Sequence, residues 1–177
     1  MSFEMMKKAV IGAVGAVALM GAVSAHAITV SPSLSQYTFL GKATLSQGFF
    51  SLDCTLSLTG DVTQSGDVLT VTVTNGSSTG SGGLCSLVTF EFPWTATIDG
   101  NTVGTGPNIP VNVTFQNVDV NGPGGQCGTG NDTVPAVFNS VNPSSVPSSF
   151  SFAATIGNCG VTGDLDETTS TLEIDNP

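Results

Sequence analysis

The sequence predicts an all-β domain, built either as an antiparallel β-sandwich or as a partly open barrel of about eight to ten short strands. Three observations lead to this prediction. Apolar and polar residues alternate over several stretches, the chain after residue 27 shows no helical period, and that part of the chain contains four cysteines. An even number of cysteines in an exported chain predicts two disulfides that staple such a domain.

The N-terminal residues 1–27 have the pattern of a secretory signal peptide. Lys7 and Lys8 are followed by an apolar run over residues 9–23, and Ala25-His26-Ala27 supplies the small residues of a cleavage site. The run is shorter than the roughly 18–20 apolar residues of a spanning helix, and no later stretch could cross a membrane. We therefore expect cleavage after Ala27, a single domain over residues 28–177, and a secreted, extracellular or cell-surface protein.

The charge balance of residues 28–177 excludes several classes of partner. This part of the chain holds one basic residue, Lys42, against twelve acidic residues, and it contains neither Arg nor His. Binding to nucleic acid requires cationic side chains on the phosphates, and adhesion to anionic lipid headgroups requires the same. We expect no nucleic-acid partner and no membrane span once the signal peptide has been removed.

The clearest strand is the stretch from Phe49 to Thr59. Its alternate residues, from Phe50 to Leu58, are apolar or Cys54, and those between them are polar. A period of two marks a strand with one buried face, so Cys54 should lie in the core. The remaining strand segments alternate in the same way: Ile28–Leu40 as an edge strand or arm, 68–74, 84–97, 109–120, 134–139, 150–156 and 168–175.

Glycine, proline, serine and asparagine mark the connections between these segments. Pro93 should break the strand that contains it, because proline cannot donate to a strand ladder. The sequence Asp99-Gly100-Asn101 predicts a hairpin turn. The other connections are predicted at residues 41–48, 64–66, 75–83, 121–133 and 140–149.

The four cysteines are Cys54, Cys85, Cys127 and Cys159, and three pairings are open to them. We favour Cys54–Cys85 with Cys127–Cys159, because sequence neighbours usually lie close together in a meander. No pair has C-x-x-C spacing, and no His follows the signal peptide, so a zinc site is not indicated.

Residues that could carry catalysis are scarce in this chain. Without His or Arg, no general base other than a carboxylate is available to a nucleophile, and we predict that the protein is not an enzyme and uses no cofactor. Asp164, Asp166 and Glu167 form an acidic cluster whose oxygens could suit Ca²⁺. A solvated acidic turn is the simpler interpretation of that cluster.

Short motifs around the cysteines carry a family resemblance. Leu52-Asp53-Cys54-Thr55 is followed by Gly83-Leu84-Cys85-Ser86, then by Pro93-Trp94, Gln126-Cys127-Gly128 and Gly157-Asn158-Cys159. In this order the motifs resemble the PraB-like family, named as activators of alkane oxidation. The resemblance covers nearly the whole chain after the signal peptide. In this family a Gly-Pro pair commonly follows the third cysteine, whereas here Gly122-Pro123 precedes it.

The resemblance implies a secreted, non-enzymatic accessory protein that promotes use of hydrophobic substrates, by binding hydrocarbon or its interface. Its partner would be a hydrophobic substrate or a cell-surface component. An alternative is a structural subunit of an extracellular assembly, in which the arm Ile28–Leu40 adds to a neighbour by self-association. A carbohydrate- or Ca²⁺-dependent binding module is the third hypothesis.

Overall fold

The computed structural model describes residues 28–31, 36–80, 83–104, 110–140, 147–169 and 172–175. The signal peptide expected at residues 1–27 lies outside these ranges. The described residues form twelve strands and two short 3₁₀ segments. Their bounds are β1 Thr29–Ser31, β2 Tyr37–Gln47, β3 Phe50–Ser65, β4 Val68–Thr79, η1 Cys85–Leu87, β5 Thr89–Glu91, β6 Trp94–Asp99, η2 Gly100–Thr102, β7 Pro110–Gly122, β8 Gly125–Gln126, β9 Asp132–Asn139, β10 Ser149–Ile156, β11 Cys159–Glu167 and β12 Glu173–Asp175.

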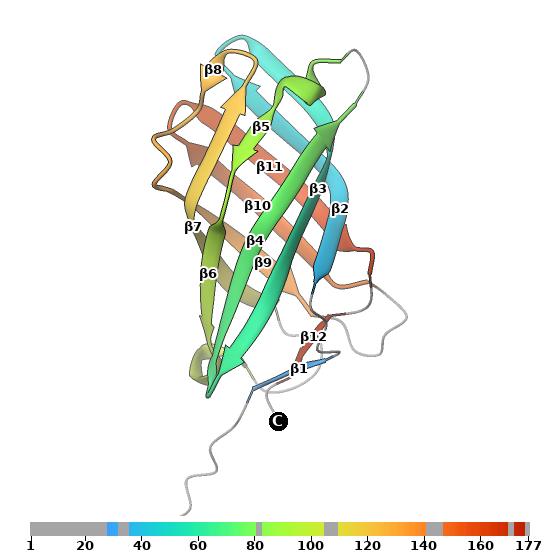
Figure 1. Cartoon of the computed structure of the whole chain (residues 1–177), viewed down its shortest axis with the longest axis vertical. Coiled ribbons are helices and arrows are strands. Elements are labelled where there is room, and N and C mark those ends of the chain that lie inside the picture. Colours follow the sequence, from blue (N-terminus) through green and yellow to red (C-terminus); the bar gives the residue numbers. More distant parts are fainter. Residues whose placement is uncertain are drawn as a thin grey trace, which may run out of the picture.

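Eight antiparallel strands close into a barrel, in the order β7–β6–β4–β3–β2–β11–β10–β9 and back to β7 (Figure 1). The all-β class and the two disulfides are confirmed, but the sandwich is wrong and the barrel is closed rather than partly open. Closure pairs the lower half of β7 with β9, from Pro110↔Asn139 to Phe115↔Val134. The upper part of β7 pairs instead with the short strands β5 and β8.

Two irregularities bend the strands so that the sheet can close. The register of β3 against β4 shifts between Thr59 and Gly60, and that of β7 against β9 shifts between Phe115 and Val118. Asn117, inside the second shift, has a φ of 58°. Bulges of this kind increase the local twist of a strand, which a closed barrel requires.

The alternation predicted for the Cys54 strand is correct over most of its length. Leu52, Cys54 and Leu56 are buried in β3, while Phe50 at its beginning is half exposed. Leu69, Val71 and Val73 form the buried face of β4, as their spacing predicts. The break predicted at Pro93 is confirmed, because it lies between β5 and β6 and is preceded by a cis peptide bond.

Several predicted connections are wrong. Residues 41–47 belong to β2, and residues 75–79 belong to β4. Asp99-Gly100-Asn101 leads into η2 rather than forming a two-residue hairpin, because the Asp99 carboxylate accepts from the Asn101 amide and starts a 3₁₀ turn.

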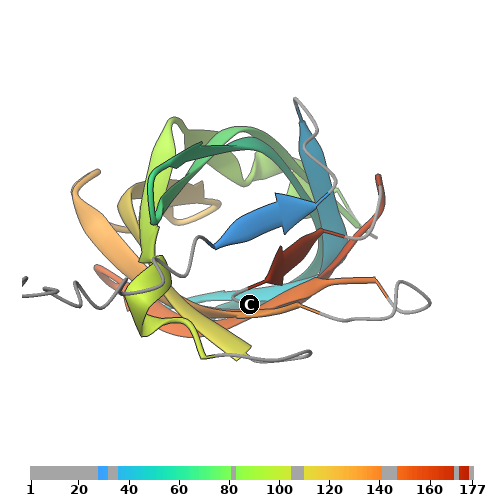
Figure 2. The same ribbon diagram turned by 90° about the horizontal axis from the view of Figure 1, so that it is seen from below.

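The arm predicted at Ile28–Leu40 is divided between two elements. Thr29–Ser31 forms β1, which pairs with β12 in a separate two-stranded sheet. Tyr37 to Leu40 belong to β2 of the barrel. Seen from below, the β1–β12 sheet lies across the lower opening of the barrel (Figure 2). Within the described residues, no helix is long and apolar enough to cross a membrane.

Candidate functional site: the barrel interior

The barrel encloses an apolar cavity of about 120 Å³. Its walls come from all eight barrel strands, and its length reaches from Tyr37 and Ile174 at the lower end to Val120 and Ile156 at the upper end. Because most of the lining side chains are hydrocarbon, water inside would find few hydrogen-bond partners. An apolar cavity of roughly 150 Å³ in another protein is known to stay dry and to bind benzene. The interior can therefore hold a small apolar molecule or a short segment of an alkyl chain.

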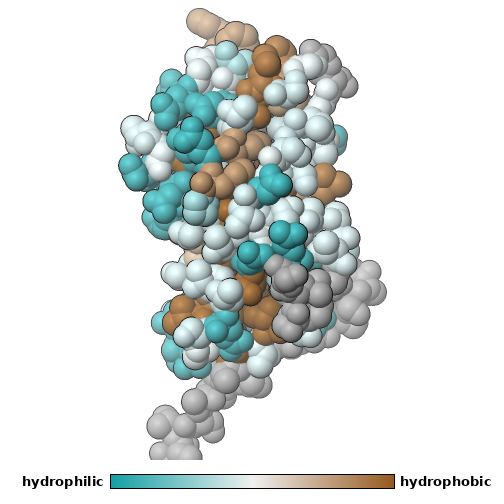
Figure 3. Space-filling view, in the orientation of Figure 1, coloured by the Kyte–Doolittle hydropathy of each residue, from teal (hydrophilic) through white to brown (hydrophobic). Residues whose placement is uncertain are grey.

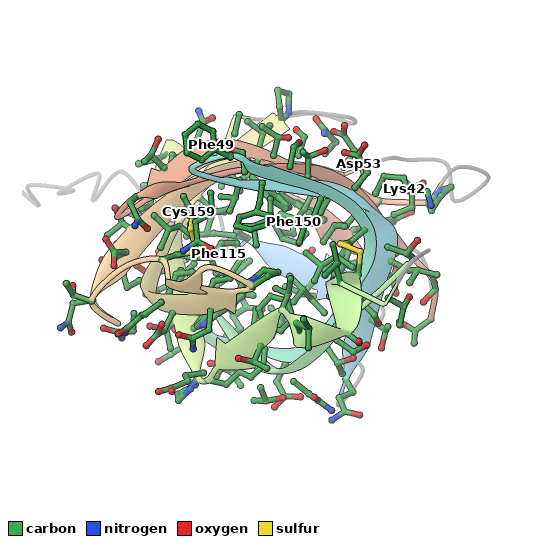
Figure 4. The ribbon with its side chains drawn as sticks, turned by 90° about the horizontal axis from the view of Figure 1, so that it is seen from above. Lys42, Phe49, Asp53, Phe115, Phe150 and Cys159 are labelled. Carbon is green, nitrogen blue, oxygen red and sulfur yellow. A yellow bond between two sulfur atoms is a disulfide. The ribbon has the colours of Figure 1, made fainter. Side chains whose placement is uncertain are left out.

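An aromatic layer crosses the middle of this interior. The ring of Phe150 lies 4.8 Å from that of Phe39, 4.9 Å from that of Phe138 and 5.8 Å from that of Phe115, measured between centroids. Phe39 stands on β2 and Phe115 on β7, which lie opposite one another in the barrel order. Phe115 and Phe150 point inward (Figure 4). The pairs with Phe39 and Phe115 are edge-to-face and the pair with Phe138 is tilted, and such ring contacts give the cavity a wall of defined shape.

A plug of apolar side chains closes the lower end. Ile28, Leu172 and Ile174, in or beside β1 and β12, are fully or almost fully buried. Gln64, at the lower end of β3, donates from Nε2 to the carbonyl oxygen of Ile28 and so ties the plug to the barrel. A Cβ on Gly100 would lie 2.3 Å from the Ile28 side chain, so this glycine is needed for the close fit.

The upper end is covered in a different way. The turn between β7 and β8 reaches Gln47, the last residue of β2. Gln47 Nε2 donates to the carbonyl oxygen of Gly125 at 3.1 Å, and Gln47 Oε1 accepts from the Gly124 amide at 3.1 Å. The Gln47 side chain is 6% exposed, and both of its polar atoms are satisfied. Sequence reasoning missed this residue, although an amide at an inward-facing position of a strand is a signal for such bonding.

Four exposed apolar side chains surround this upper end, and we call them the apolar rim. They are Phe49, Phe50, Leu84 and Leu87. Phe49 lies in the β2–β3 turn and Phe50 begins β3, while Leu84 precedes η1 and Leu87 ends it. The Cys54–Cys85 disulfide ties η1 to β3. Phe49 is completely exposed, and apolar surface is visible at this end of the molecule (Figure 3).

Both disulfides have the pairing that we favoured. Cys54 is bonded to Cys85 and Cys127 to Cys159, across sequence separations of 31 and 32 residues. All four cysteines are buried in the same upper cluster of core residues, together with Trp94. The disulfides therefore brace the half of the barrel that carries the apolar rim.

The structure does not bring the three candidate Ca²⁺ ligands together. Asp164 and Asp166 are exposed on the outer face of β11, whereas Glu167 is buried on the opposite face. The Glu167 carboxylate accepts from the Leu172 amide and from the Thr169 hydroxyl, which fixes the approach to β12. Across the described ranges, no group of three acidic, cysteine or histidine side chains is placed to hold a metal ion.

The outer face of the barrel is polar and carries Lys42, the one basic residue of the chain after residue 27. Its ammonium donates to the Thr55 hydroxyl at 3.0 Å, and the Thr44 hydroxyl donates to the Asp53 carboxylate at 2.6 Å. Lys42 and Asp53 lie outside the ring of strands (Figure 4). The few charges near β2 and β3 are thus kept away from the apolar interior.

Asp119 is a buried carboxylate on β7 that sequence reasoning also missed. It is 7% exposed, and Gln126 Nε2 donates to its Oδ2 at a long 3.4 Å. Its Oδ1 is buried with no hydrogen-bond partner among the described residues. An unpaired buried oxygen of this kind destabilises the folded state.

These features define a small closed β-barrel with an apolar interior, a plugged lower end and an upper end bordered by exposed apolar residues. The chain belongs to the family of alkane oxidation protein activators, PraA/PraB-like, whose model matches residues 3–176. No curated protein and no solved structure gives a significant match to this chain.

Proposed function

We propose that this protein is an exported, non-enzymatic accessory protein that promotes the use of alkanes by binding a hydrocarbon chain inside its barrel. The observation that carries the proposal is the apolar cavity, in a member of a family named for alkane oxidation. Small eight-stranded barrels have an interior that is either filled by side chains or able to hold one small ligand. In this barrel, space for a ligand remains.

The size of the cavity sets the expected affinity. A four-carbon segment moved from water into the barrel gains roughly 3 kcal/mol, which corresponds to a dissociation constant of roughly 1–10 mM. Binding at this strength matters only where hydrocarbon is abundant, as it is beside an oil phase. The protein would therefore act at the hydrocarbon surface rather than as a scavenger of dilute alkane.

Two further observations support an accessory role outside the cytoplasm. The signal-peptide pattern at residues 1–27 and the two disulfides fit an oxidising compartment. After that segment the chain contains no His or Arg, and the cavity is lined mainly by hydrocarbon groups. Binding without chemical conversion is what such a lining supports.

Trp94 provides a direct test, because it is the only tryptophan of the chain and lines the cavity. A bromoalkane in the cavity should quench its fluorescence by contact with the bromine atom. We expect saturable quenching by 1-bromobutane and competition by unlabelled short alkanes. Non-saturable quenching, equal to that of free tryptophan, would overturn the proposal.

A pair of leucine substitutions separates the cavity from the outer surface. Ala136→Leu adds three carbons to the cavity wall, whereas Ala153→Leu adds the same group to an exposed position on β10. We expect the first to weaken 1-bromobutane binding at least roughly tenfold, because the added group occupies the space, and the second to leave it unchanged. Equal binding by both variants would place the ligand outside the barrel.

The link to alkane use needs a cellular test. A strain that lacks the gene should grow more slowly on an alkane than on a soluble carbon source, and the wild-type gene should restore growth. The Ala136→Leu variant should fail to restore growth, whereas Ala153→Leu should succeed. Full restoration by Ala136→Leu would disconnect the cavity from alkane use.

A further inference from the structure

We propose that apolar ligands enter the barrel at its upper end, beneath the β7–β8 turn, and that the Gln47 side chain is the latch that closes this entrance. The apolar rim would then be the surface that meets the hydrocarbon phase. This inference rests on the proposed function, since it assigns an entrance to the cavity described above.

The latch joins strands on opposite sides of the barrel. Gln47 ends β2, and the Gly122–Gly125 segment joins β7 to β8; four strand-to-strand steps separate β2 from β7 in either direction around the barrel. The turn must therefore extend over the mouth to reach Gln47. A Cβ on either Gly122 or Gly124 would lie 2.7 Å from Gln47 Oε1. A side chain at either position would therefore displace the Gln47 amide from the turn.

The two ends differ in how firmly they are closed. At the lower end, Ile28, Leu172 and Ile174 bury their side chains in the core. The turn at the upper end has the sequence Gly122-Pro123-Gly124-Gly125, which offers the core no large aliphatic or aromatic side chain. Two neutral hydrogen bonds to Gln47 hold this turn down, and their loss exposes little apolar surface. The upper end therefore opens more readily than the lower end.

The apolar rim places this entrance at a hydrocarbon surface. Phe49 and Phe50 follow Gln47 after a single residue, Gly48, so a hydrocarbon phase in contact with Phe49 lies beside the latch. The chain has a net charge of −10, which opposes contact with anionic lipid and does not oppose contact with an uncharged alkane. An uncharged hydrocarbon phase is the partner that fits both the rim and the cavity behind it.

Gln64 offers a matched control for the latch, because it is also a glutamine that holds one end of the barrel, but the other end. Stopped-flow quenching of Trp94 by 1-bromobutane gives the binding rates. We expect Gln47→Ala to increase both the association and the dissociation rate at least roughly fivefold, with the equilibrium constant changed less than twofold. Gln64→Ala should leave both rates within twofold of the wild-type rates.

The outcomes separate this inference from the proposed function. Suppose that quenching at equilibrium is saturable in the wild type. If the binding rates then increase in Gln64→Ala alone, in both variants or in neither, the proposed entrance is wrong, although the cavity still binds the ligand. If quenching is not saturable in the wild type, the proposed function itself fails. Should Gln47→Ala not fold, Gln47→Met keeps the length of the side chain and removes both hydrogen bonds to the turn, and it should show the same acceleration.

The rim is tested by adsorption to oil. Phe49→Ser should reduce adsorption of the protein to a dodecane–water interface at least roughly threefold, because Phe49 is the most exposed large apolar side chain among the described residues. Val68→Ser, at the β3–β4 turn on the opposite end, removes exposed apolar surface without touching the rim and should have no effect. Equal loss in both variants, or binding to anionic vesicles in preference to dodecane, would overturn the assignment of the rim.

Discussion

Removal of each disulfide tests how the upper half of the barrel is stabilised. The loop closed by Cys54–Cys85 spans 31 residues, and its release into the unfolded chain should lower the free energy of unfolding by about 4 kcal/mol. The loop closed by Cys127–Cys159 spans 32 residues, so the same argument predicts an equal loss. Double Cys→Ala variants are the appropriate change, because a single substitution leaves a reactive free thiol.

The two bridges differ in how firmly the folded protein would hold their residues once the disulfide is removed. Cys85 lies in the three-residue segment η1, and the described residues just before it, Gly83 and Leu84, belong to no strand, so its release also frees part of the native state. Cys127 is held independently by its carbonyl, which accepts from the Asn158 amide at 3.0 Å, and Cys159 pairs with Gln47 in the sheet. We therefore expect the full loss of about 4 kcal/mol at Cys127–Cys159 and about 1 kcal/mol less at Cys54–Cys85.

Urea unfolding followed by Trp94 fluorescence measures both values, with the m-value as a check that unfolding stays two-state. A larger loss at Cys54–Cys85 than at Cys127–Cys159 would refute the reasoning, because it would mean that η1 is held in place by more than its bridge. Binding of 1-bromobutane should persist in the folded fraction of both variants. Its disappearance from folded Cys54→Ala/Cys85→Ala protein would show that the Cys54–Cys85 bridge shapes the cavity as well as stabilising the fold.

Two carboxylates give further predictions. The Asn101 backbone amide, and then its side-chain amide, donate to Asp99 and hold the pKa of its carboxyl below the ordinary value of 3.8. The ionised carboxyl therefore contributes stability above pH 3.8, and this contribution is lost as the pH falls through the lowered pKa. Asp99→Ala should be less stable than the wild type at pH 7, and the difference should vanish in strong acid. Urea unfolding at each pH measures the difference. Asp119→Leu should raise the free energy of unfolding by about 1 kcal/mol, because it removes a buried oxygen that has no hydrogen-bond partner among the described residues and fills its place with apolar atoms. A lower free energy of unfolding for Asp119→Leu would show that Oδ1 is satisfied in solution.

The faces of the strands could be predicted from the sequence, because a period of two is a local signal. Leu69, Val71 and Val73 alternate with threonines, and each of the three is buried. The continuation of β2 through residues 41–47 could not be predicted in this way, since Gly41 and Lys42 resemble a connection. Gly41 is required there because a Cβ would lie 2.0 Å from the Asp164 carbonyl oxygen of the paired strand. The local sequence cannot distinguish a glycine that is required by a neighbouring strand from a glycine that is required by a turn.

Closure of the barrel and the candidate site depend on contacts between distant residues. The pairing of Val113 with Ala136 joins β7 to β9 across the glycine-rich segment 121–131. The sequence of neither strand indicates which other strand it pairs with. The cavity is the space left among side chains from eight strands, so its existence depends on the closed geometry. The two disulfides could be predicted from the number of cysteines. The role proposed for Gln47 could not, because it depends on β2 and β7 lying opposite one another in the closed barrel.

Closure also bears on the alternative hypothesis of a structural subunit. That hypothesis rests on exposed strand edges, which proteins often protect with lysine, and this chain has only Lys42 after residue 27. In the closed barrel, each of the eight strands has a neighbour on both sides, which removes the need for charged protection.

The arm that would add to a neighbour is represented by β1, which pairs with β12 of the same chain and plugs the barrel. Exchange of β1 between two copies would therefore have to remove Ile28 and Ile174 from the core. For the closed form we expect light scattering to show a monomer even at high protein concentration. A stable dimer that dissociates on deletion of residues 28–31 would instead support assembly through this arm.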